Sequence, residues 1–238
     1  MVRLGWGALN ALQAMFTILV TVLGFPVALL LGMFCGPAVP LRMASWYWAP
    51  LLFAGAGAKL EVEGAEAIDW SRAQVLVANH ASMFDIAAMF HAVPVPLRFM
   101  LKRELAAMPF IGWYARAMGM VFIDRANARE ARRRLGDAAD RLRADATLIA
   151  FPEGTRSKDG TTGPFKGGAF QVAIEAGVPV VPVAIIGSGE VLPPSGFNVR
   201  PGTIRVRFGA PIDTRGMQAS DRSALTQRAR DAVIALQA

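Results

Sequence analysis

Cysteine and histidine are nearly absent from this chain. Its 238 residues include one cysteine, Cys35, and two histidines. One cysteine cannot form an internal disulfide. One cysteine and two histidines are also fewer than the four ligands of the usual tetrahedral zinc site. The sequence also lacks a G-x-S-x-G nucleophile elbow, a Walker A loop and a complete G-x-G-x-x-G fingerprint. These absences argue against a disulfide scaffold, a structural zinc domain and the common nucleotide-binding loops.

Charged residues are scarce as well. They make up 18% of the chain, against 54% hydrophobic residues, and the mean hydropathy is +0.38. This composition excludes a disordered chain and exceeds what a soluble domain needs, so it suggests a membrane. Basic residues outnumber acidic ones by 25 − 18 = 7. Such a balance suits nucleic acid, anionic lipid or a small anionic substrate. Nucleic acid fits least, because the basic residues are mixed with acids and do not form one stripe with aromatics.

The N-terminus contains a long run without charge. No charged residue lies between Arg3 and Arg42, and the stretch Leu4–Leu41 would reach about 57 Å as one helix, against roughly 30 Å of bilayer hydrocarbon. We therefore expect a break within it. The candidate breakers are Gly24, Pro26, Gly32, Gly36, Pro37 and Pro40. A second uncharged stretch, Met43–Ala58, begins near the aromatic sequence Trp46–Trp48, which is typical of a membrane interface.

Residues 1–58 are therefore predicted to form two apolar helical segments joined near Pro37–Arg42. They could form a membrane-embedded hairpin, or one span followed by a surface helix, and the arginines at both ends of the first run favour the hairpin. A cleaved signal peptide fits poorly because its apolar region is about 7–15 residues. A lipoprotein anchor at Cys35 fits poorly because the bulky Met33 and Phe34 precede it. A buried core helix remains the alternative.

Residues 59–238 are predicted to form an α/β domain with a mixed sheet flanked by helices, because charges return and apolar segments alternate with amphipathic ones. The predicted strands are 74–78, 97–101, 120–123, 147–151, 180–186 and 203–208. The predicted helices are 85–93, one from Pro109 to about Met118, 127–145, 168–176 and 220–236. The arginines of 127–145 alternate with acids, which favours a solvated, ion-paired face over a membrane- or carrier-binding patch.

The first candidate site follows the strand 74–78 and reads Asn79-His80-x4-Asp85. On one regular helix, residues five apart point about 140° apart and cannot touch. If His80 precedes the helix, however, the loop can fold the imidazole onto the carboxylate, as in a general base with its orienting acid. A capped helix start with a buried histidine, Ser82 being the N-cap, is the alternative. No activated protein nucleophile accompanies the pair, so the nucleophile would belong to a substrate or be water.

Two further strand ends carry cations. After 147–151, a turn at Pro152 and Gly154 presents Glu153, Thr155 and Arg156 together. Lys166 stands before two glycines that lead into a helix, and Arg125 follows the strand 120–123. Arginine, lysine and a glycine-rich helix start are what an anionic phosphate needs. An ordinary surface turn remains the alternative for each motif taken singly.

Together these segments resemble the glycerolipid acyltransferase family, and within it the lysophosphatidic acid (1-acyl-glycerol-3-phosphate) acyltransferases. The resemblance covers about residues 60–210, in the family's order and spacing. Its four blocks are Asn79–Asp85, Phe122–Arg125, Phe151–Arg156 and Val178–Val183. The segments Lys102–Leu105 and Pro109–Gly112 also match what usually lies between the first two blocks. Residues 1–58 match only as an apolar N-terminal anchor.

The resemblance implies an acyl transfer without an acyl-enzyme. His80 would deprotonate the hydroxyl at position 2 of lysophosphatidic acid, and the oxygen would attack a thioester of coenzyme A or acyl carrier protein. Asp85 would orient the imidazole. No metal or bound cofactor is required. The resemblance places the enzyme at the inner membrane of the cell, with the catalytic domain on the cytoplasmic side.

The resemblance also implies a phosphate site. Its expected residues are Arg125 and Arg156 with Lys102 or Lys166, in a pocket shaped by Glu153, Gly154 and Thr155. Two other interpretations stay open: the same chemistry on another lysolipid, such as lyso-ornithine lipid, or a basic membrane-tethered binding protein without catalysis. The His80–Asp85 spacing argues against the second, because a scaffold does not need it.

Overall fold

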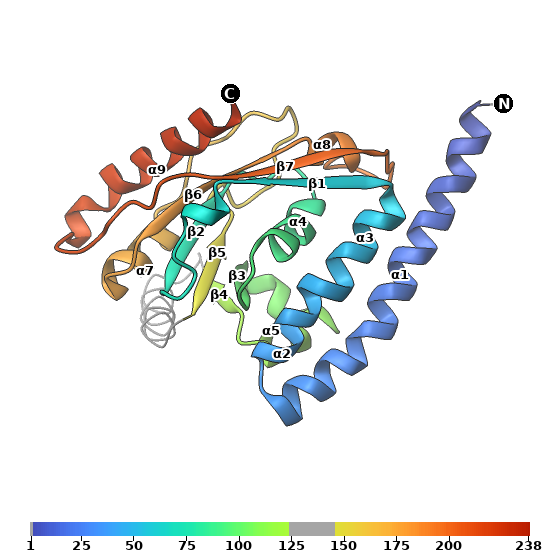
Figure 1. Ribbon diagram of the computed structural model, residues 1–238, viewed down its shortest axis with the longest axis horizontal. Coiled ribbons are helices and arrows are strands. Elements are labelled where there is room, and N and C mark those ends of the chain that lie inside the picture. The colour runs from blue at the N-terminus through green and yellow to red at the C-terminus, as the bar shows by residue number, and fades with distance from the viewer. Residues whose placement is uncertain (1, 124–145) are drawn as a thin grey trace.

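The computed structural model describes residues 2–123 and 146–238, with side chains from Trp6 onward. A pair of apolar helices lies against a sheet that is covered by helices on both faces (Figure 1). The predicted helix 127–145 and the predicted site residue Arg125 fall outside the described residues.

The first helix, α1, runs without interruption from Val2 to Cys35. Three of the candidate breakers, Gly24, Pro26 and Gly32, lie within this helix and do not break it. The two glycines serve close packing instead: a Cβ on Gly24 would lie 3.0 Å from Cε1 of Tyr47, and one on Gly32 would lie 2.7 Å from Cε of Met118. The helix ends only at Gly36, whose φ of 78° leaves the helical region before Pro37.

The chain then returns along α1 as a second helical segment (Figure 1). This segment consists of α2 (Ala38–Met43), a π-helical turn (Ala44–Trp48) and α3 (Ala49–Ala56). The indole Nε1 of Trp48 donates to Oγ1 of Thr21 at 3.1 Å, and Gly55 gives room to the ring of Phe16. The predicted pair of apolar segments is therefore found, with its joint at Gly36–Pro37. By length and composition, Trp6–Cys35 is apolar enough to cross a membrane.

The predicted mixed sheet is confirmed. The seven described strands form one sheet in the order β1-β7-β6-β2-β5-β3-β4. Among them β6 and β7 pair antiparallel and the other neighbours pair parallel. The strands are β1 (Ala58–Glu63), β2 (Gln74–Ala78), β3 (Leu97–Lys102), β4 (Val121–Ile123), β5 (Thr147–Ala150), β6 (Val180–Ile186) and β7 (Gly202–Phe208).

Strand β1 was not predicted from the sequence. It alternates small or apolar residues with Lys59, Glu61 and Glu63, and it lies at the edge of the sheet. Its carboxylates pair with β7: Arg205 Nε lies 2.6 Å from Glu61, and Arg207 Nε lies 2.9 Å from Glu63. An edge strand that faces solvent does not need the apolar run that identified the buried strands.

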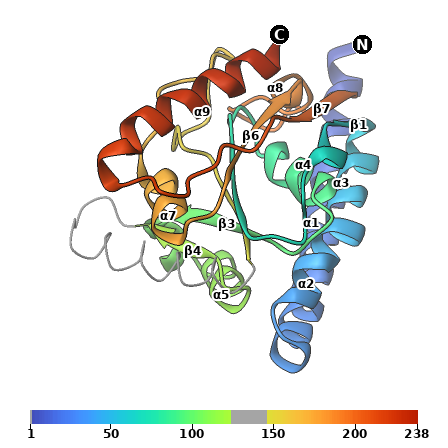
Figure 2. The same cartoon turned by 60° about the vertical axis from the view of Figure 1, so that its left-hand side comes forward.

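Helices cover both faces of the sheet (Figures 1 and 2). Leu76 and Ile149 point toward α3, α4 and α5, whereas Val75 and Leu148 point toward α7 and α9. The helices are α4 (Phe84–Ala92), α5 (Ile111–Ala117), α7 (Gly168–Ala176), α8 (Ser188–Val191) and α9 (Arg222–Gln237), with short 3-10 turns at Ala65–Ala67, Arg103–Ala107 and Ala219–Asp221. Helix α5 begins two residues after Pro109, because Phe110 takes a φ of 63°.

The parallel register brings the candidate motifs to one edge of the sheet. Val77 of β2 pairs with Ala150 of β5, and Phe99 of β3 pairs with Ile149. The carboxyl ends of these strands therefore lie at the same level. This is the edge at which α/β sheets place their ligands.

Candidate active site

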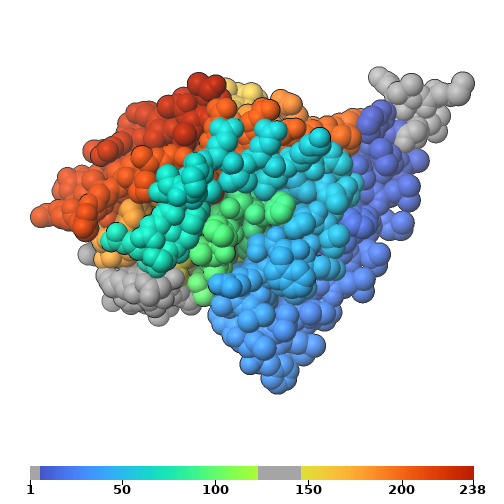
Figure 3. Space-filling model, in the orientation of Figure 1, coloured from blue at the N-terminus to red at the C-terminus, as the bar shows by residue number. Residues whose placement is uncertain are grey.

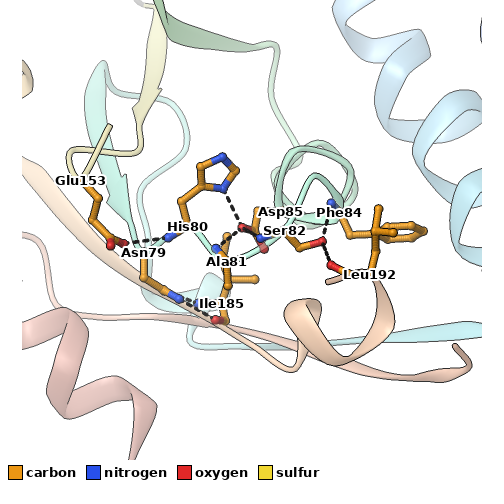
Figure 4. A network of polar contacts seen from close by, with 9 residues as sticks. All are labelled: Asn79, His80, Ala81, Ser82, Phe84, Asp85, Glu153, Ile185 and Leu192. Atoms are coloured by element: carbon orange, nitrogen blue, oxygen red, sulfur yellow. Dashed lines mark hydrogen bonds and ion pairs between the residues drawn. The ribbon is translucent and has the colours of Figure 1, made fainter. Parts of the chain in front are cut away.

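The structure brings His80 and Asp85 together at the carboxyl edge of β2 (Figure 4). His80 Nδ1 lies 2.7 Å from Oδ2 of Asp85. The same oxygen accepts the backbone N–H groups of Ala81 and Ser82, each at 2.8 Å. Asp85 is fully buried in the first turn of α4, and His80 remains partly open. Because Nδ1 is held by the carboxylate, Nε2 is the ring nitrogen left to exchange a proton.

Side chains on both sides of the histidine fix its loop. The Asn79 amide bonds to both backbone groups of Ile185 in β6, each at 2.8 Å. The Ser82 hydroxyl donates to the carbonyl of Leu192 at 2.7 Å and accepts the N–H of Phe84 at 3.1 Å. Ser82 thus satisfies one backbone N–H at the helix start, although the N-cap position itself is Met83. His80 and Asp85 meet as the first interpretation requires, and the use of His80 as a base stays a prediction.

The loop that follows β5 encloses His80 from three directions. The Phe151 ring stacks on the imidazole, with centroids 4.1 Å apart and planes inclined by 10°. Glu153 Oε1 accepts the backbone N–H of His80 at 2.9 Å. The backbone N–H of Ser157 donates to the carbonyl oxygen of His80 at 2.7 Å. The plane of the ring and the backbone beneath it are therefore both restrained by one loop.

Glu153 is placed differently from the sequence-based expectation. Its carboxylate is buried, and its second oxygen, Oε2, accepts the N–H of Gly163 at 3.0 Å. Both oxygens are thus engaged by backbone groups inside the loop region, and the side chain acts as a brace. Gly154, with a φ of 76°, makes the turn that directs the glutamate inward.

The predicted cationic residues that the structure describes lie on the same edge of the sheet and have exposed side chains. Lys102 ends β3, and Thr155 and Arg156 lie on the loop after β5, all three with exposed side chains. Lys166 is also exposed, and its backbone N–H donates to Pro152 at 3.0 Å, which ties it to that loop. In the described part of the chain, no group of three His, Cys, Asp or Glu side chains is placed to hold a metal ion.

Farther along this loop, Asp159 stabilises a tight turn. Its carboxylate accepts the hydroxyl and backbone N–H of Thr161 and the hydroxyl of Ser157. These hydrogen bonds lower the pKa of Asp159 to about 2. The loop is therefore ordered by its own polar contacts as well as by Glu153.

Asn79 and Phe151 lie within the first and third sequence blocks, but the sequence alone indicates no role for them. Their partners are far away in the chain: Asn79 bonds to Ile185, 106 positions later, and Phe151 stacks on His80, 71 positions earlier. The strand pairing carries this information: if β5 is assigned beside β2, the loop after β5 lies next to the loop after β2.

A mixed α/β sheet with an oriented histidine at its carboxyl edge is typical of an enzyme that uses an imidazole base. The Acyltransferase family model matches residues 59–186, more than half of the chain, and the chain belongs to this family. The resemblance inferred from the four sequence blocks is confirmed.

Curated relatives in this family are about one third identical to the chain. The chain is 32% identical over 213 residues to the 1-acyl-sn-glycerol-3-phosphate acyltransferase of Pseudomonas aeruginosa, which spans 84% of the chain and 80% of the relative. It is 33% identical to chloroplastic LPAT1 of Arabidopsis thaliana over 84% of the chain and 56% of the relative. The chain spans about half the length of the chloroplast relatives that it matches.

A solved structure matches nearly the whole fold. The crystal structure of the 1-acyl-sn-glycerophosphate (LPA) acyltransferase PlsC from Thermotoga maritima superposes with a TM-score of 0.80 at 27% identity. The match covers 99% of this chain and 98% of that one. The apolar helical pair is therefore part of the shared fold as well as the α/β domain.

Proposed function

We propose that this chain transfers a fatty acyl group from an acyl thioester to the sn-2 hydroxyl of 1-acyl-sn-glycerol 3-phosphate, giving phosphatidic acid. The observation that carries the proposal is the His80–Asp85 pair, held at the carboxyl edge of the sheet with Nε2 free of Asp85. The names of the relatives in Pseudomonas and Thermotoga support the same acceptor.

In the proposed reaction, Nε2 of His80 takes the proton of the acceptor hydroxyl. The hydroxyl oxygen attacks the carbonyl carbon of the thioester. The carbon–sulfur bond then breaks, and the imidazolium returns the proton to the leaving thiolate. Asp85 stabilises the imidazolium in between, because its buried carboxylate lies 2.7 Å from Nδ1. Its Oδ2 is also held by the N–H groups of Ala81 and Ser82, whereas its Oδ1 has no hydrogen-bond partner among the described residues.

The loop after β5 prepares the histidine for this role. Stacking on Phe151 prevents the imidazole from rotating away from Asp85 and places an aromatic face 4.1 Å from the charge that forms. Glu153 holds the backbone of His80 in place. Preorganisation of this kind matters because small misplacements of a catalytic group are costly.

The acceptor phosphate is proposed to bind to Arg156, with Lys102 or Lys166 beside it. These cations are exposed on the edge of the sheet that carries His80. Arg125, outside the described residues, stays a sequence-based candidate for the same role, and Thr155 stays a candidate for the pocket. The acyl donor is proposed to be a thioester of coenzyme A or acyl carrier protein, with no bound cofactor.

The proposed membrane anchor is the α1–α3 pair, lying in one leaflet. The outward side of α1 is apolar and exposed, and α1 forms one whole edge of the molecule (Figure 3). Its other side is docked along its length: Asn10 accepts the N–H of Val199, Phe16 packs on Gly55, and Phe25 contacts Phe110. A helix that carries a polar domain along its length cannot cross a bilayer, which favours the hairpin over a full span. We propose the cytoplasmic face of the inner membrane as its location.

The test is a panel assay with purified full-length protein in detergent. Lysophosphatidic acid, lyso-ornithine lipid and a neutral lysolipid are offered with coenzyme A and acyl-carrier-protein thioesters, and His80→Ala is the control for background transfer. We expect transfer to lysophosphatidic acid only. Equal use of a phosphate-free lysolipid would contradict the proposed acceptor, and no transfer by folded protein would favour a binding protein.

A further inference from the structure

A cluster of large apolar side chains lies on the surface between β3 and the end of α5. Its members are Met108, Phe110, Ile111 and Trp113, each between 44% and 61% exposed, and we refer to them as the α5 patch. The proposed chemistry uses none of them. Four such side chains within six residues are more than the scattered exposure that is normal for a soluble surface.

The local backbone is built to turn this patch outward. Phe110 has a φ of 63°, and it is the one described residue other than glycine with a positive φ. Gly112 packs against the preceding turn so closely that a Cβ there would lie 2.3 Å from the carbonyl oxygen of Ala106. Strained backbone of this kind persists only where the surrounding structure enforces it. The inner side of α5 is occupied by buried residues such as Ala115, so the patch faces solvent.

The patch adjoins the apolar side of α1. Phe25 of α1 contacts the rings of Phe110 at 5.8 Å and Tyr114 at 6.1 Å, and Phe110 contacts Trp113 at 5.3 Å. In two views, α5 lies at the same end of the molecule as the turn between α1 and α2 (Figures 1 and 2). The exposed apolar surface of α1 therefore continues onto the catalytic domain.

Basic side chains flank the patch along the chain. Within residues 102–117, Lys102, Arg103 and Arg116 are exposed, against one exposed acid, Glu104. An apolar centre with a basic rim is complementary to an anionic bilayer surface. The segment also leaves the carboxyl end of β3, at the edge of the sheet that carries His80.

We propose that the α5 patch is a second membrane-contact surface, which inserts beside α1 into an anionic bilayer and holds the catalytic edge of the sheet against the lipid. The proposal rests on the membrane association of α1 proposed above. Continuity with α1 favours lipid over a protein partner such as an acidic carrier, because a carrier would compete with the bilayer for the same apolar surface.

The experiment measures fluorescence quenching of the full-length protein in vesicles of phosphatidylcholine and phosphatidylglycerol with brominated acyl chains. The chain has five tryptophans, so the signal of Trp113 is obtained by subtracting the Trp113→Phe variant. We expect a component of quenching specific to Trp113 that grows with the phosphatidylglycerol content. No turnover is needed, so the result does not depend on the proposed reaction.

Two matched variants test the patch. Ile111→Glu and Ile234→Glu make the same change at similar exposure, 48% and 39%, but Ile234 lies on α9, away from α5 (Figure 1). Ile111→Glu is expected to lower the inserted population about tenfold, the fold-change for losing the burial of one isoleucine. Ile234→Glu is expected to leave the Trp113 signal unchanged. Unfolding curves of both variants establish that they fold alike.

Three results would overturn the proposal. If the other tryptophans were quenched but Trp113 were not, α1 would anchor the protein without the patch. If no tryptophan were quenched, the membrane association of α1 would fail too. If Trp113 responded to acyl carrier protein and not to brominated lipid, the patch would be a protein-docking surface.

Discussion

Replacing Glu153 with glutamine separates two roles for this side chain. The sequence assigned it to the phosphate pocket, whereas its carboxylate accepts the N–H groups of His80 and Gly163, at 2.9 and 3.0 Å. Glutamine has nearly the same shape but only one acceptor oxygen. In either orientation its NH₂ group faces a backbone N–H, so one buried donor loses its partner.

The expected cost follows from this geometry. A buried donor without a partner costs about 1–3 kcal/mol of folding free energy. For a chain of this size, that lowers the unfolding temperature by about 2–4 °C per kcal/mol. The effect on turnover is expected to be larger than the effect on stability. A shift of about 1 Å in a catalytic group can lower the rate about a hundredfold. The structure therefore predicts a large drop in kcat for Glu153→Gln, with the KM for lysophosphatidic acid nearly unchanged.

The assay is steady-state kinetics in detergent with both substrates varied, alongside thermal unfolding. Asp213→Asn is the matched control, because it makes the same carboxylate-to-amide change at a solvent-exposed carboxylate outside this loop, where its partner is Arg215. It should alter kcat by no more than about twofold, as surface changes usually do. A Glu153→Gln protein with normal kcat and a raised KM for the lysolipid would refute the brace and restore the pocket role.

Three further predictions address the remaining parts of the proposal. His80→Ala is expected to reduce turnover by about 10²–10⁴-fold, and Asp85→Asn to reduce it strongly, with unchanged circular dichroism; near-normal turnover by folded His80→Ala would exclude the base. Arg156→Lys should raise the KM for lysophosphatidic acid but not for the thioester, because lysine lacks the bidentate fork; a defect against the thioester alone would make Arg156 a donor-binding residue. A chain beginning at Lys59 should be insoluble and inactive on vesicles, because the α1–α3 pair covers α4; a soluble, monomeric, fully active product would contradict the anchor.

The sequence predicted buried elements better than exposed ones. The strands 74–78 and 180–186 and the helix 168–176 match the structure residue for residue, because their apolar runs end at clear turn signals. Strand β1 was not predicted, because its residues alternate between charged and apolar as in a solvent-exposed edge strand. Its assignment depends on pairs such as Glu61 with Arg205, which are 144 positions apart. Local composition does not carry that information.

The breakers in α1 show a different limit. Glycine and proline lower helix propensity, so Gly24, Pro26 and Gly32 were candidates for the break in the uncharged run as well as Gly36 and Pro37, where the break occurs. In the structure, Gly24 and Gly32 allow Tyr47 and Met118 to approach the helix closely, so tertiary packing outweighs the local cost. A single sequence does not distinguish a glycine that ends a helix from one that admits a neighbour.

The candidate site divides in the same way between local and distant causes. The spacing of His80 and Asp85 indicated that they can meet if His80 precedes the helix, and the structure shows that it does. What orients the imidazole was not inferable from that spacing, because Glu153 comes from a loop 73 positions later. The link between them is the parallel pairing of β2 with β5, in which Val77 lies opposite Ala150. That register places the first block of the family beside the third, so residues of the third block hold the backbone and ring of the proposed base. We therefore expect a substitution in the loop after β5 to lower the rate constant for transfer even where the residue does not contact the acceptor.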